Sequence, residues 1–545
     1  MPAVFERIRR VIDDSPQLSH WEERLRLLVY GRAENDDLRR YEQIPWQPPL
    51  DQRSRRWQTG LFAVSGFLGG LIIAASAPVW RLAVPSWRIT IPGIPHPGTA
   101  FQSTSLFLLG LILLGVGWLG LIWLAGRIAE PRRALIVVGA VIALWAIPVS
   151  LGPPLLSNDV YSYVAQGEMA SRGIDPGSNG PASLGRNDWT SAADPVWRAA
   201  AAPYGPVAVF TSRTVVEVAG HDPALALWFY RVVVIAGIAM AAVGVSLIAS
   251  RSGVAPAVAV AIGIGNPIVI LHLIGGAHND AVMLGLLALG LAAAQRQRRV
   301  LALALLTAAT AIKLPAALGL VYLGWSWDGV VATTRRRIIT TAGALVSSVC
   351  AIALGCVVMG MGPGWLTALT STGKVNDTYS PTTKLGFSIS ELLAAVGVNV
   401  DGATLTAGVR ALGLLAVVIL ALIVMLRSPR IGVVRATGVM LVAYVLLGPV
   451  IWPWYLAAGF ALLAACGLGR YQPASLVVCL AVSWFVWPTS VVSIQELGGG
   501  YQHLRGLGVV LLVGALAWAA QRFASRWERR THPEMNSAEA VGAQR

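Results

Sequence analysis

The stretch Leu155-Leu156-Ser157-Asn158-Asp159-Val160-Tyr161-Ser162-Tyr163 places one carboxylate and two tyrosines directly after an apolar run of the chain. That run ends near Leu151 and is broken by Pro153-Pro154. The chain contains many such apolar runs of about 20 residues, the length that an α-helix needs to cross a bilayer. The stretch therefore predicts a polar site at the mouth of a membrane span, where a long polar loop begins.

The composition of the chain also indicates a membrane protein. Of its 545 residues, 55% are hydrophobic and 13% are charged, whereas a soluble domain carries roughly 25% charged residues. The net charge of +15 comes from arginines that cluster between the apolar runs, as they do on the cytoplasmic flanks of spans. We therefore expect no nucleic-acid partner. The cysteines lack metal-ligand spacing and are expected to pack in the core: Cys350, Cys356, Cys466 and Cys479.

Hydropathy and arginine bias predict an all-α polytopic membrane protein with roughly 14 transmembrane helices. The predicted spans are about 57–78, 101–124, 134–151, 224–249, 254–273, 281–295, two short helices within 300–333, 338–360, 404–426, 431–449, 454–469, 473–490 and 505–521. The stretch 300–333 needs two helices because it lies between two arginine clusters, both expected inside. Ile312-Lys313-Leu314-Pro315 supplies the break between them.

Three segments follow from this topology. A cytoplasmic extension (1–55), with an amphipathic stretch, precedes the membrane domain (56–521), and a cytoplasmic tail (522–545) follows it. The loop after the third span, 153–222, carries seven acidic and four basic residues, opposite in sign to the cytoplasmic flanks. Within it, 204–218 is expected to form a helix along the interface. The predicted outer loops are 153–222, 275–280, 361–400 and 491–503.

Asp159 is the first candidate for chemistry. A carboxylate at a span boundary costs solvation energy unless it faces water, protein or a function. A helix cap or an interface anchor would also explain its position. The neighbouring tyrosines favour a sugar site, because they offer flat faces and hydroxyl groups. The candidate binding residues around it are Asn158, Tyr161, Tyr163, Arg172 and Asp175.

His278-Asn279-Asp280 is the second candidate, because three hydrogen-bonding side chains follow a flexible Gly275-Gly276 at a span mouth. They are expected either to line the same cavity or to cap the next helix, a role that Asn and Asp favour. A metal site would need a second cluster of ligands. Lys313 is the third candidate, since a buried lysine usually has a partner or a task, although its ammonium could also reach the interface.

Further candidates are cations for a phosphate group and aromatic residues near the membrane surface. The cations are Lys374, Lys384 and Arg505. Trp454 and Tyr455 lie in an outer turn rich in proline and aromatic residues, which an aromatic belt at the interface explains equally well. The sequence shows no P-loop, nucleophile elbow, zinc-protease or dinucleotide motif in a suitable context.

Four motifs resemble a known family. Ser157–Tyr163, followed by Arg172-Gly173-Ile174-Asp175-Pro176, resembles the outer-loop signature of GT-C membrane glycosyltransferases. Gly275–Asp280, Ile312–Pro315 and Trp452-Pro453-Trp454-Tyr455-Leu456 follow in the matching order. Together these motifs resemble the polyprenol-phosphomannose-dependent α-(1→6)-mannosyltransferases that build the backbone of lipomannan and lipoarabinomannan. The resemblance extends over about 57–521.

The resemblance implies a GT-C-like fold in the bacterial plasma membrane, with its active site on the extracytoplasmic face and both termini in the cytoplasm. It implies that a polyprenyl-phosphate mannose donor enters from the membrane lipid and that a glycolipid mannan is the acceptor. Two alternatives are a flippase for lipid-linked sugars and a GT-C enzyme that uses another polyprenyl-phosphate sugar.

The resemblance also assigns roles to residues. Asp159 would be the general base of an inverting displacement, and Lys374, Lys384 or Arg505 would balance the charge of the departing phosphate. His278, Asp280 and the tyrosines would orient sugar hydroxyls. Where the family often has an acidic pair, this chain has Asn158-Asp159. A metal clamp between two acids is thus not implied, and we expect no cofactor requirement.

Overall fold

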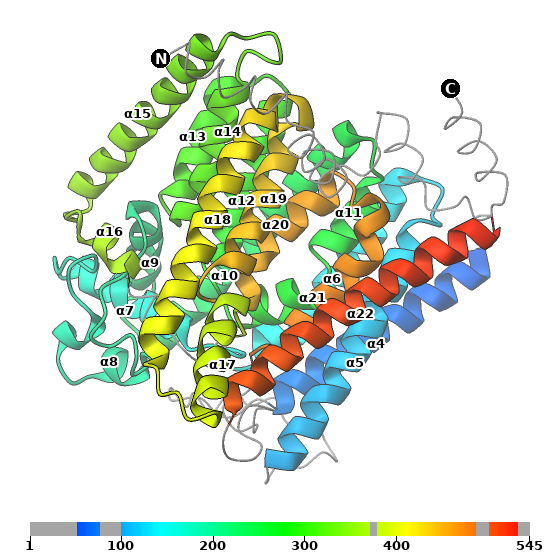
Figure 1. The fold of residues 1–545 in the computed structure, drawn as a ribbon, viewed down its shortest axis with the longest axis horizontal. Helices are drawn as coiled ribbons and strands as arrows, with labels where there is room; N and C mark the ends of the chain where they lie inside the picture. The colour runs from blue at the N-terminus through cyan, green and yellow to red at the C-terminus, as the bar shows by residue number, and fades with distance from the viewer. Residues whose placement is uncertain (1–51, 77–99, 371–378, 487–500, 532–545) are drawn as a thin grey trace. The chain divides into compact units, whose positions relative to one another are not determined.

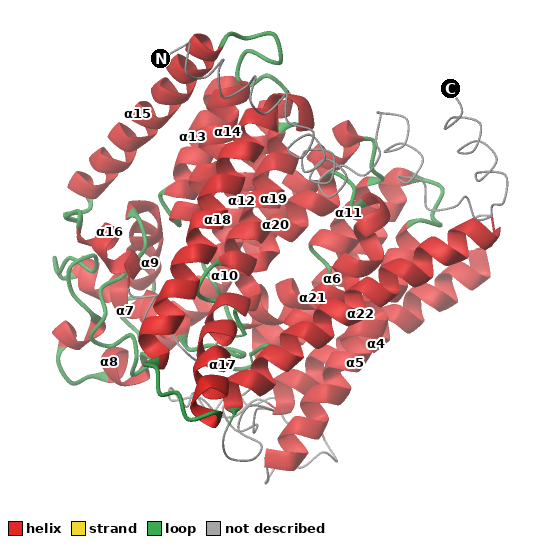
Figure 2. Ribbon diagram, in the orientation of Figure 1, coloured by secondary structure: helices red, strands yellow, loops and turns green. Residues whose placement is uncertain are grey.

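The computed structural model describes residues 52–76, 100–370, 379–486 and 501–531, which form helices and connecting loops with no β-strand among them (Figures 1 and 2). The predicted all-α class is therefore confirmed for this part of the chain. Most of the predicted N-terminal extension, Lys374 and the end of the tail from residue 532 lie outside the described residues.

Seven helices in this part of the chain are long and apolar enough to cross a membrane. They are α4 (Gln52–Ser76), α5 (Ala100–Ala125), α6 (Pro131–Leu151), α10 (Pro223–Ser252), α15 (Thr334–Val358), α18 (Gly402–Ile431) and α22 (Gln502–Thr531). A bent pair of shorter helices would bring the number to eight. The predicted count of roughly 14 is not confirmed, because several predicted spans form helices shorter than the about 20 residues that a bilayer requires.

The shorter apolar helices are α12 (Asp280–Gln295), α13 (Arg299–Thr310), α14 (Ala317–Ser326), α19 (Val433–Leu447) and α20 (Pro453–Ala465). α20 packs against α19 and α10, and α12 packs against α10 and α13. By contrast, the spans α15, α18 and α22 expose most of their apolar side chains, as expected for helices that contact lipid chains. Cys350 is exposed on α15, so the expectation that all four cysteines pack in the core was wrong for this residue.

The prediction of one continuous span over 254–273 was wrong. The chain forms α11 (Pro256–Gly263) and then a π-helix, η3 (Ile268–Gly275), bent from it by 63°. The bend lies at Asn266 and Pro267, where proline has no N–H to continue the helix. The Asn266 side chain donates to the carbonyls of Ile262 and Gly263 at 3.1 and 2.8 Å and accepts from Val269 N at 3.0 Å. It thus satisfies backbone groups that the break would otherwise leave unpaired.

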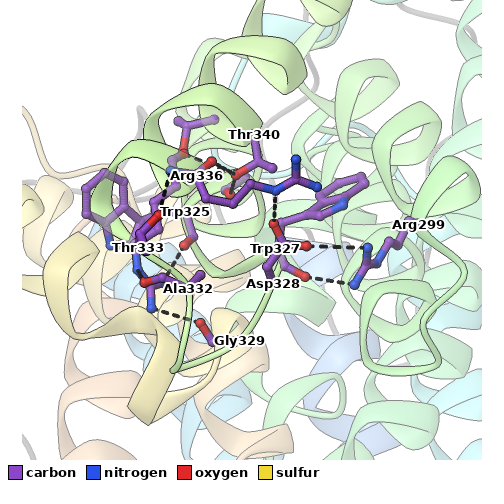
Figure 3. Close-up of polar contacts among 12 residues, drawn as sticks. Arg299, Trp325, Trp327, Asp328, Gly329, Ala332, Thr333, Arg336 and Thr340 are labelled. Carbon is purple, nitrogen blue, oxygen red and sulfur yellow. Dashed lines mark hydrogen bonds and ion pairs between the residues drawn. The ribbon is translucent and has the colours of Figure 1, made fainter.

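The predicted break within 300–333 is confirmed. α13 ends at Thr310, the short 3-10 helix η4 (Leu314–Ala316) follows Lys313, and α14 then begins. Asp328, after α14, lies 3.8 Å from Arg299 and 2.7 Å from Arg336 (Figure 3). One carboxylate therefore joins the two arginine clusters that flank this stretch, and both clusters lie at the same end of these helices.

Half of the polar loop expected at 153–222 is helical. It contains α7 (Asp159–Ser171), η2 (Pro181–Leu184), α8 (Asp188–Ala192) and α9 (Pro206–Val218). The predicted helix at 204–218 corresponds to α9, whereas α7 was missed. α7 is buried from Val160 to Ala170 because α9 and α10 pack against it. The predicted outer loop 361–400 likewise contains α16 (Gly364–Ala368) and α17 (Pro381–Ala395), and Figure 1 shows α7, α8, α9 and α16 grouped together.

The predicted sidedness can be tested with single cysteines in a variant without the four native ones. We expect Arg186→Cys, an exposed position in the predicted outer loop, to react with a membrane-impermeant thiol reagent in intact cells. Gln297→Cys, exposed beside the first arginine cluster, should react only after the membrane is opened. The reason is the preference of arginine for cytoplasmic flanks. Labelling at position 297 but not at 186 in intact cells would reverse the topology.

Candidate functional site

Two backbone segments meet at the candidate site. Leu155 N donates to Gly275 O at 2.9 Å, which joins the start of the segment 153–222 to the end of η3. Shortly after these two residues in their own segments, Leu156 and Ala277 have positive φ values of 62° and 53°. Such a conformation is strained for residues other than glycine and is frequent at functional sites. The two segments place Asp159 and His278 beside each other.

Asp159 is the first residue of α7, and its carboxylate faces aromatic side chains. Its Oδ2 accepts from Tyr163 Oη at 3.5 Å and lies 3.7 Å from His278 Nδ1. The Asp159 backbone N–H donates to Ser157 Oγ at 3.1 Å. Asn158, not Asp159, occupies the cap position of α7. The described contacts of the Asp159 carboxylate therefore lie with side chains of the site, and a fifth of this side chain, 20%, stays exposed.

The surroundings of Asp159 change its proton affinity. Removal from bulk water raises the pKa of this carboxyl to about 6, the positive charge of Lys313 opposes the rise, and the carboxylates of Asp194 and Asp280 add to it. A carboxylate with a pKa of about 6 is ionised at neutral pH and holds a proton more strongly than an ordinary aspartate. Both properties suit a general base, whose best pKa lies near the working pH.

Aromatic side chains enclose the pair of Asp159 and His278. Tyr163 Oη lies 3.2 Å from His278 Nδ1, and the ring of Tyr163 contacts that of Tyr204 at a centroid distance of 5.4 Å. The imidazole of His278 stacks on Trp454 at 3.9 Å, and Trp454 in turn stacks on Trp452 at 5.2 Å. The chain thus gathers side chains from α7, the η3–α12 turn and α20 into one aromatic wall.

Lys313 and Asp280 form a buried ion pair next to this wall. Lys313 Nζ lies 2.9 and 2.8 Å from the two carboxylate oxygens of Asp280. The side chains of Lys313 and Asp280 are 13% and 4% exposed, so Lys313 pairs within the protein and does not reach out to the interface. Its ammonium also lies 4.3 Å from the centre of the Tyr455 ring and 5.9 Å from that of Tyr204.

Tyr204 and Asp194 belong to this site, although the sequence did not single them out. Val207 N donates to Ala311 O at 3.1 Å, so the segment that carries Tyr204 lies against the break that carries Lys313. Asn158 Nδ2 donates to Asp194 Oδ2 at 3.3 Å. The available sequence signals were a tyrosine between two prolines, for Tyr204, and one of the seven acids in the segment 153–222, for Asp194. Neither signal distinguishes them from other loop residues.

Asn279 and Tyr161 are buried beside the site with unsatisfied polar atoms. Within the described residues, Asn279 Oδ1 and Tyr161 Oη have no hydrogen-bond partner. The Asn279 side chain does not cap α12, although it occupies the cap position. Unpaired buried polar atoms are rare because they cost free energy, and they often mark functional positions. In the same part of the chain, no three His, Cys, Asp or Glu side chains are arranged to hold a metal ion.

Arg172 and Asp175 take part in contacts elsewhere. Arg172 Nη2 lies 2.6 Å from Glu168 Oε1, and His221 Nδ1 lies 2.7 Å from Glu168 Oε2. Asp175 accepts from Gly177 N at 2.8 Å and from Gly362 N at 3.0 Å. These contacts hold α7, the loop after α9 and the loop before α16 to one another, and the described structure does not place Arg172 or Asp175 against Asp159.

Lys384 and Arg505 come from neighbouring helices, α17 and α22. Lys384 is fully buried, and its Nζ lies 3.5 Å from His503 Nδ1 at the start of α22. A side chain at Gly506, next to Arg505, would collide with the Lys384 stem. The start of α17 is fixed to the segment that leads to Trp454, because its hydroxyl side chains donate to backbone carbonyls there. These donors are Ser380 and Thr382, to Gly448 O, and Thr383, to Pro449 O.

The fold and this site define a class: a helical, multi-pass membrane protein in which charged and aromatic side chains meet where the helices are joined. The model of a family described as alpha-(1->6)-mannopyranosyltransferase, N-terminal domain, matches residues 60–332. A second model, described as MptB C-terminal domain, matches residues 382–497. The chain belongs to the α-(1→6)-mannopyranosyltransferase family, and it is a membrane glycosyltransferase that transfers mannose. The class of enzyme predicted from the motifs is thereby confirmed.

Similar proteins come from mycobacteria and corynebacteria. A Mycolicibacterium smegmatis protein named "Probable alpha-(1->6)-mannopyranosyltransferase" is 32% identical over 385 residues, which cover 63% of this chain and 68% of that protein. Alpha-(1->6)-mannopyranosyltransferase A of Corynebacterium glutamicum is 28% identical over 69% of this chain and 78% of its own length. Alpha-(1->6)-mannopyranosyltransferase B of the same organism is 27% identical over 69% of this chain and 67% of its own length. No solved structure matches the chain significantly.

Proposed function

We propose that this mannosyltransferase takes mannose from polyprenyl-phosphate mannose and transfers it to a lipid-anchored mannan acceptor, forming an α-(1→6) linkage with inversion. The linkage is supported by the names of the relatives. A lipid-linked donor agrees with a chain whose long helices expose apolar side chains. The reaction would take place on the extracytoplasmic face of a bacterial plasma membrane, in a GT-C-like membrane domain whose two termini lie in the cytoplasm.

The observation that carries this proposal is the position of Asp159. This carboxylate is partly exposed, lies beside Tyr163 and His278, and has a pKa raised to about 6. Tyr204, Trp452 and Tyr455 stay partly exposed and would supply aromatic surfaces and hydroxyl groups of the kind that bind sugar rings. The buried Trp454, stacked on His278 and Trp452, would support them. An acceptor hydroxyl that reaches the exposed part of Asp159 would be in hydrogen-bond range of a base that is ionised at neutral pH.

In the proposed step, Asp159 removes the proton from the 6-hydroxyl of the acceptor mannose. The oxygen of that hydroxyl forms a bond to the anomeric carbon of the β-linked mannosyl phosphate while the bond from that carbon to the phosphate oxygen breaks. Polyprenyl phosphate leaves with the electron pair and the negative charge, and the proton stays on Asp159 until solvent removes it. Attack opposite to the leaving group gives the α linkage. No metal or other cofactor enters this step.

Cations would stabilise the departing phosphate. Lys313, which pairs with Asp280 and lies beside the Tyr204 ring, would be one such cation in the same site as the proposed base. Lys384 and Arg505 supply positive charge where α17 meets α22, and α17 is anchored to the segment that carries Trp454. His278, Asn279 and Asp280, with Asn158, would orient sugar hydroxyls or hold the groups that do so.

Replacement of Lys384 by Met is expected to raise the apparent KM for the donor about tenfold or more, because a charge-assisted hydrogen bond to phosphate contributes about 1.5–3 kcal/mol. Methionine fills a similar volume at this buried position. Initial rates at varied donor concentration in reconstituted vesicles measure the effect. Arg213→Gln, at a partly exposed arginine of α9 that pairs with Glu217, serves as the control for loss of one positive charge. An unchanged donor KM in Lys384→Met would assign the phosphate to other cations.

The proposed function is tested with purified protein in vesicles, labelled polyprenyl-phosphate mannose and an oligomannose acceptor. We expect an elongated product whose new linkage is α-(1→6) by NMR, and no product when polyprenyl-phosphate arabinose or glucose with the same label replaces the donor. Movement of labelled donor across the bilayer without product would instead identify a flippase. Equal transfer from another polyprenyl-phosphate sugar would contradict the choice of mannose.

A further inference from the structure

Four exposed arginines gather where α13 and α15 begin. We define the arginine patch as Arg298, Arg299, Arg335 and Arg336. Asp328 joins its two halves, at 3.8 Å from Arg299 and 2.7 Å from Arg336 (Figure 3). Arg299 also donates to Trp327 O at 2.9 Å and lies 5.2 Å from the centre of the Trp327 ring. The patch is thus assembled from two parts of the chain and is held by specific contacts.

The loop beneath the patch is fixed by a fifth arginine. Arg337 is buried and donates to the carbonyls of Trp325 at 2.7 Å and Gly329 at 2.8 Å, with further bonds to those of Val330 and Ala332. Thr333 caps α15 by accepting from Arg336 N at 3.3 Å. Because the backbone is held at so many points, the patch arginines start from fixed backbone positions, and Arg299 and Arg336 are also held by their side-chain contacts to Asp328, which lowers the entropy cost of binding.

The positive charge of the patch is not balanced by the described residues. Asp328 is the single described acid in contact with it, while the side chains of Arg298 and Arg335 make no hydrogen bond or ion pair within the described part of the chain. Neither α13 nor α15 has an acid in its first turn, although the start of a helix favours negative charge and disfavours arginine. Four guanidinium groups together with two helix starts would therefore be stabilised by an added anion.

Apolar side chains beside the patch indicate where that anion resides. Val331 is 90% and Val300 is 85% exposed, and Trp327 lies among the arginines (Figure 3). The loop directly precedes α15, which is long and apolar enough to span a membrane. Arginine, tryptophan and exposed valine at the end of a span are typical of the headgroup level of a bilayer, where cations, aromatic rings and apolar groups each find a suitable environment.

We propose that the arginine patch binds the phosphate of an anionic phospholipid headgroup, with Val300 and Val331 against the upper part of its acyl chains. The proposal does not depend on the sugar donor or on Asp159. A lipid bound here would hold the α13 and α15 starts together across Asp328, and would thus stabilise the folded membrane domain.

The test is lipid binding to the full-length protein, measured by native mass spectrometry with phosphatidylglycerol or phosphatidylcholine. We expect phosphatidylglycerol to remain bound to the wild type and to raise its unfolding temperature, and phosphatidylcholine to do neither. An arginine near an anionic membrane surface contributes about fivefold in affinity, so Arg298→Gln/Arg335→Gln should bind phosphatidylglycerol roughly 30-fold more weakly. Neither guanidinium group has a described hydrogen bond or ion pair within the fold, so we expect the variant to fold normally.

The matched control is Arg132→Gln/Arg133→Gln, which removes two exposed arginines from the first turn of α6. Because a single helix starts there, this variant should keep most of the binding. Equal losses in the two double variants, or undiminished binding in Arg298→Gln/Arg335→Gln, would overturn the proposal. Stabilisation by inorganic phosphate as large as that by phosphatidylglycerol would also overturn it, since the site would then hold a free anion.

Discussion

Asp159→Asn is expected to reduce mannosyl transfer by about 10²–10⁴-fold, the contribution of a positioned general base. That loss corresponds to roughly 3–5 kcal/mol of activation free energy. Asparagine keeps the size and the hydrogen-bonding reach toward Tyr163 and His278 but cannot take up the proton. The measurement is transfer from labelled polyprenyl-phosphate mannose to an oligomannose acceptor, with donor binding measured separately on the same preparation. We expect donor binding and the unfolding temperature to stay close to those of the wild type.

Asp194→Asn is the matched control for this substitution. Asp194 is a carboxylate in the same site and accepts a hydrogen bond from Asn158, but it does not contact Tyr163 or His278 in the described structure. Its replacement should leave most of the activity, because the base would remain. Near wild-type transfer by Asp159→Asn would remove Asp159 as the base, and a comparable collapse of both variants would point to a structural role for the acids of this site.

The second large effect is expected from the Lys313–Asp280 pair, through the charge of Asp159. In the wild type, transfer should fall as the pH decreases through about 6, because Asp159 takes up a proton there. The groups that face Asp159 are Tyr163, Asp194, Tyr204, His278, Asp280 and Lys313. Among them, the positive charge of Lys313 lowers the pKa of Asp159, while the negative charge of Asp280 raises it.

Lys313→Met should therefore move the acidic limb of the kcat/KM profile to higher pH, and Asp280→Asn should move it to lower pH. At pH 6 the wild type should retain about half of its maximal rate, since half of the base is ionised at its pKa. Lys313→Met should fall below that fraction and Asp280→Asn should exceed it. Opposite displacements are the informative result, because damage to the fold would lower both rates without moving the limbs apart.

Each single substitution also leaves a buried charge without its partner, which destabilises a protein by about 3–5 kcal/mol. The double variant Lys313→Met/Asp280→Leu removes both charges and should recover much of that loss in thermal unfolding. Its acidic limb should lie between those of the two single variants. If the wild-type profile has an acidic limb that none of these variants moves, the Lys313–Asp280 pair does not control the pKa of Asp159. A wild-type profile without the limb would contradict the role of Asp159 itself.

The sequence alone determined the helical membrane class, the general placement of the longer spans and the family. These properties follow from local composition and motif order. A run of about 20 apolar residues is long enough for a span, and the order of motifs can be read directly along the chain. The break at Ile312–Pro315 was also predictable from the sequence. The arginine clusters on either side of it cannot both lie in the cytoplasm if the chain between them crosses the membrane only once. The Gly265-Asn266-Pro267 signal for the bent helix was also present, although apolar residues on both sides of it favoured one continuous span.

Only the tertiary structure decided which polar residues share a site. Lys313 and Asp280 are 33 residues apart, and nothing in their local sequence shows that each neutralises the other. Tyr204 lies near Lys313 because the loop that carries Tyr204 packs against the break between α13 and η4. Arg172 and Asp175 are closer to Asp159 in sequence, but they bind Glu168 and Gly362 instead. The physical reason is that a buried charge must find its partner in space, and the packing of helices from distant parts of the chain determines which partner is within reach.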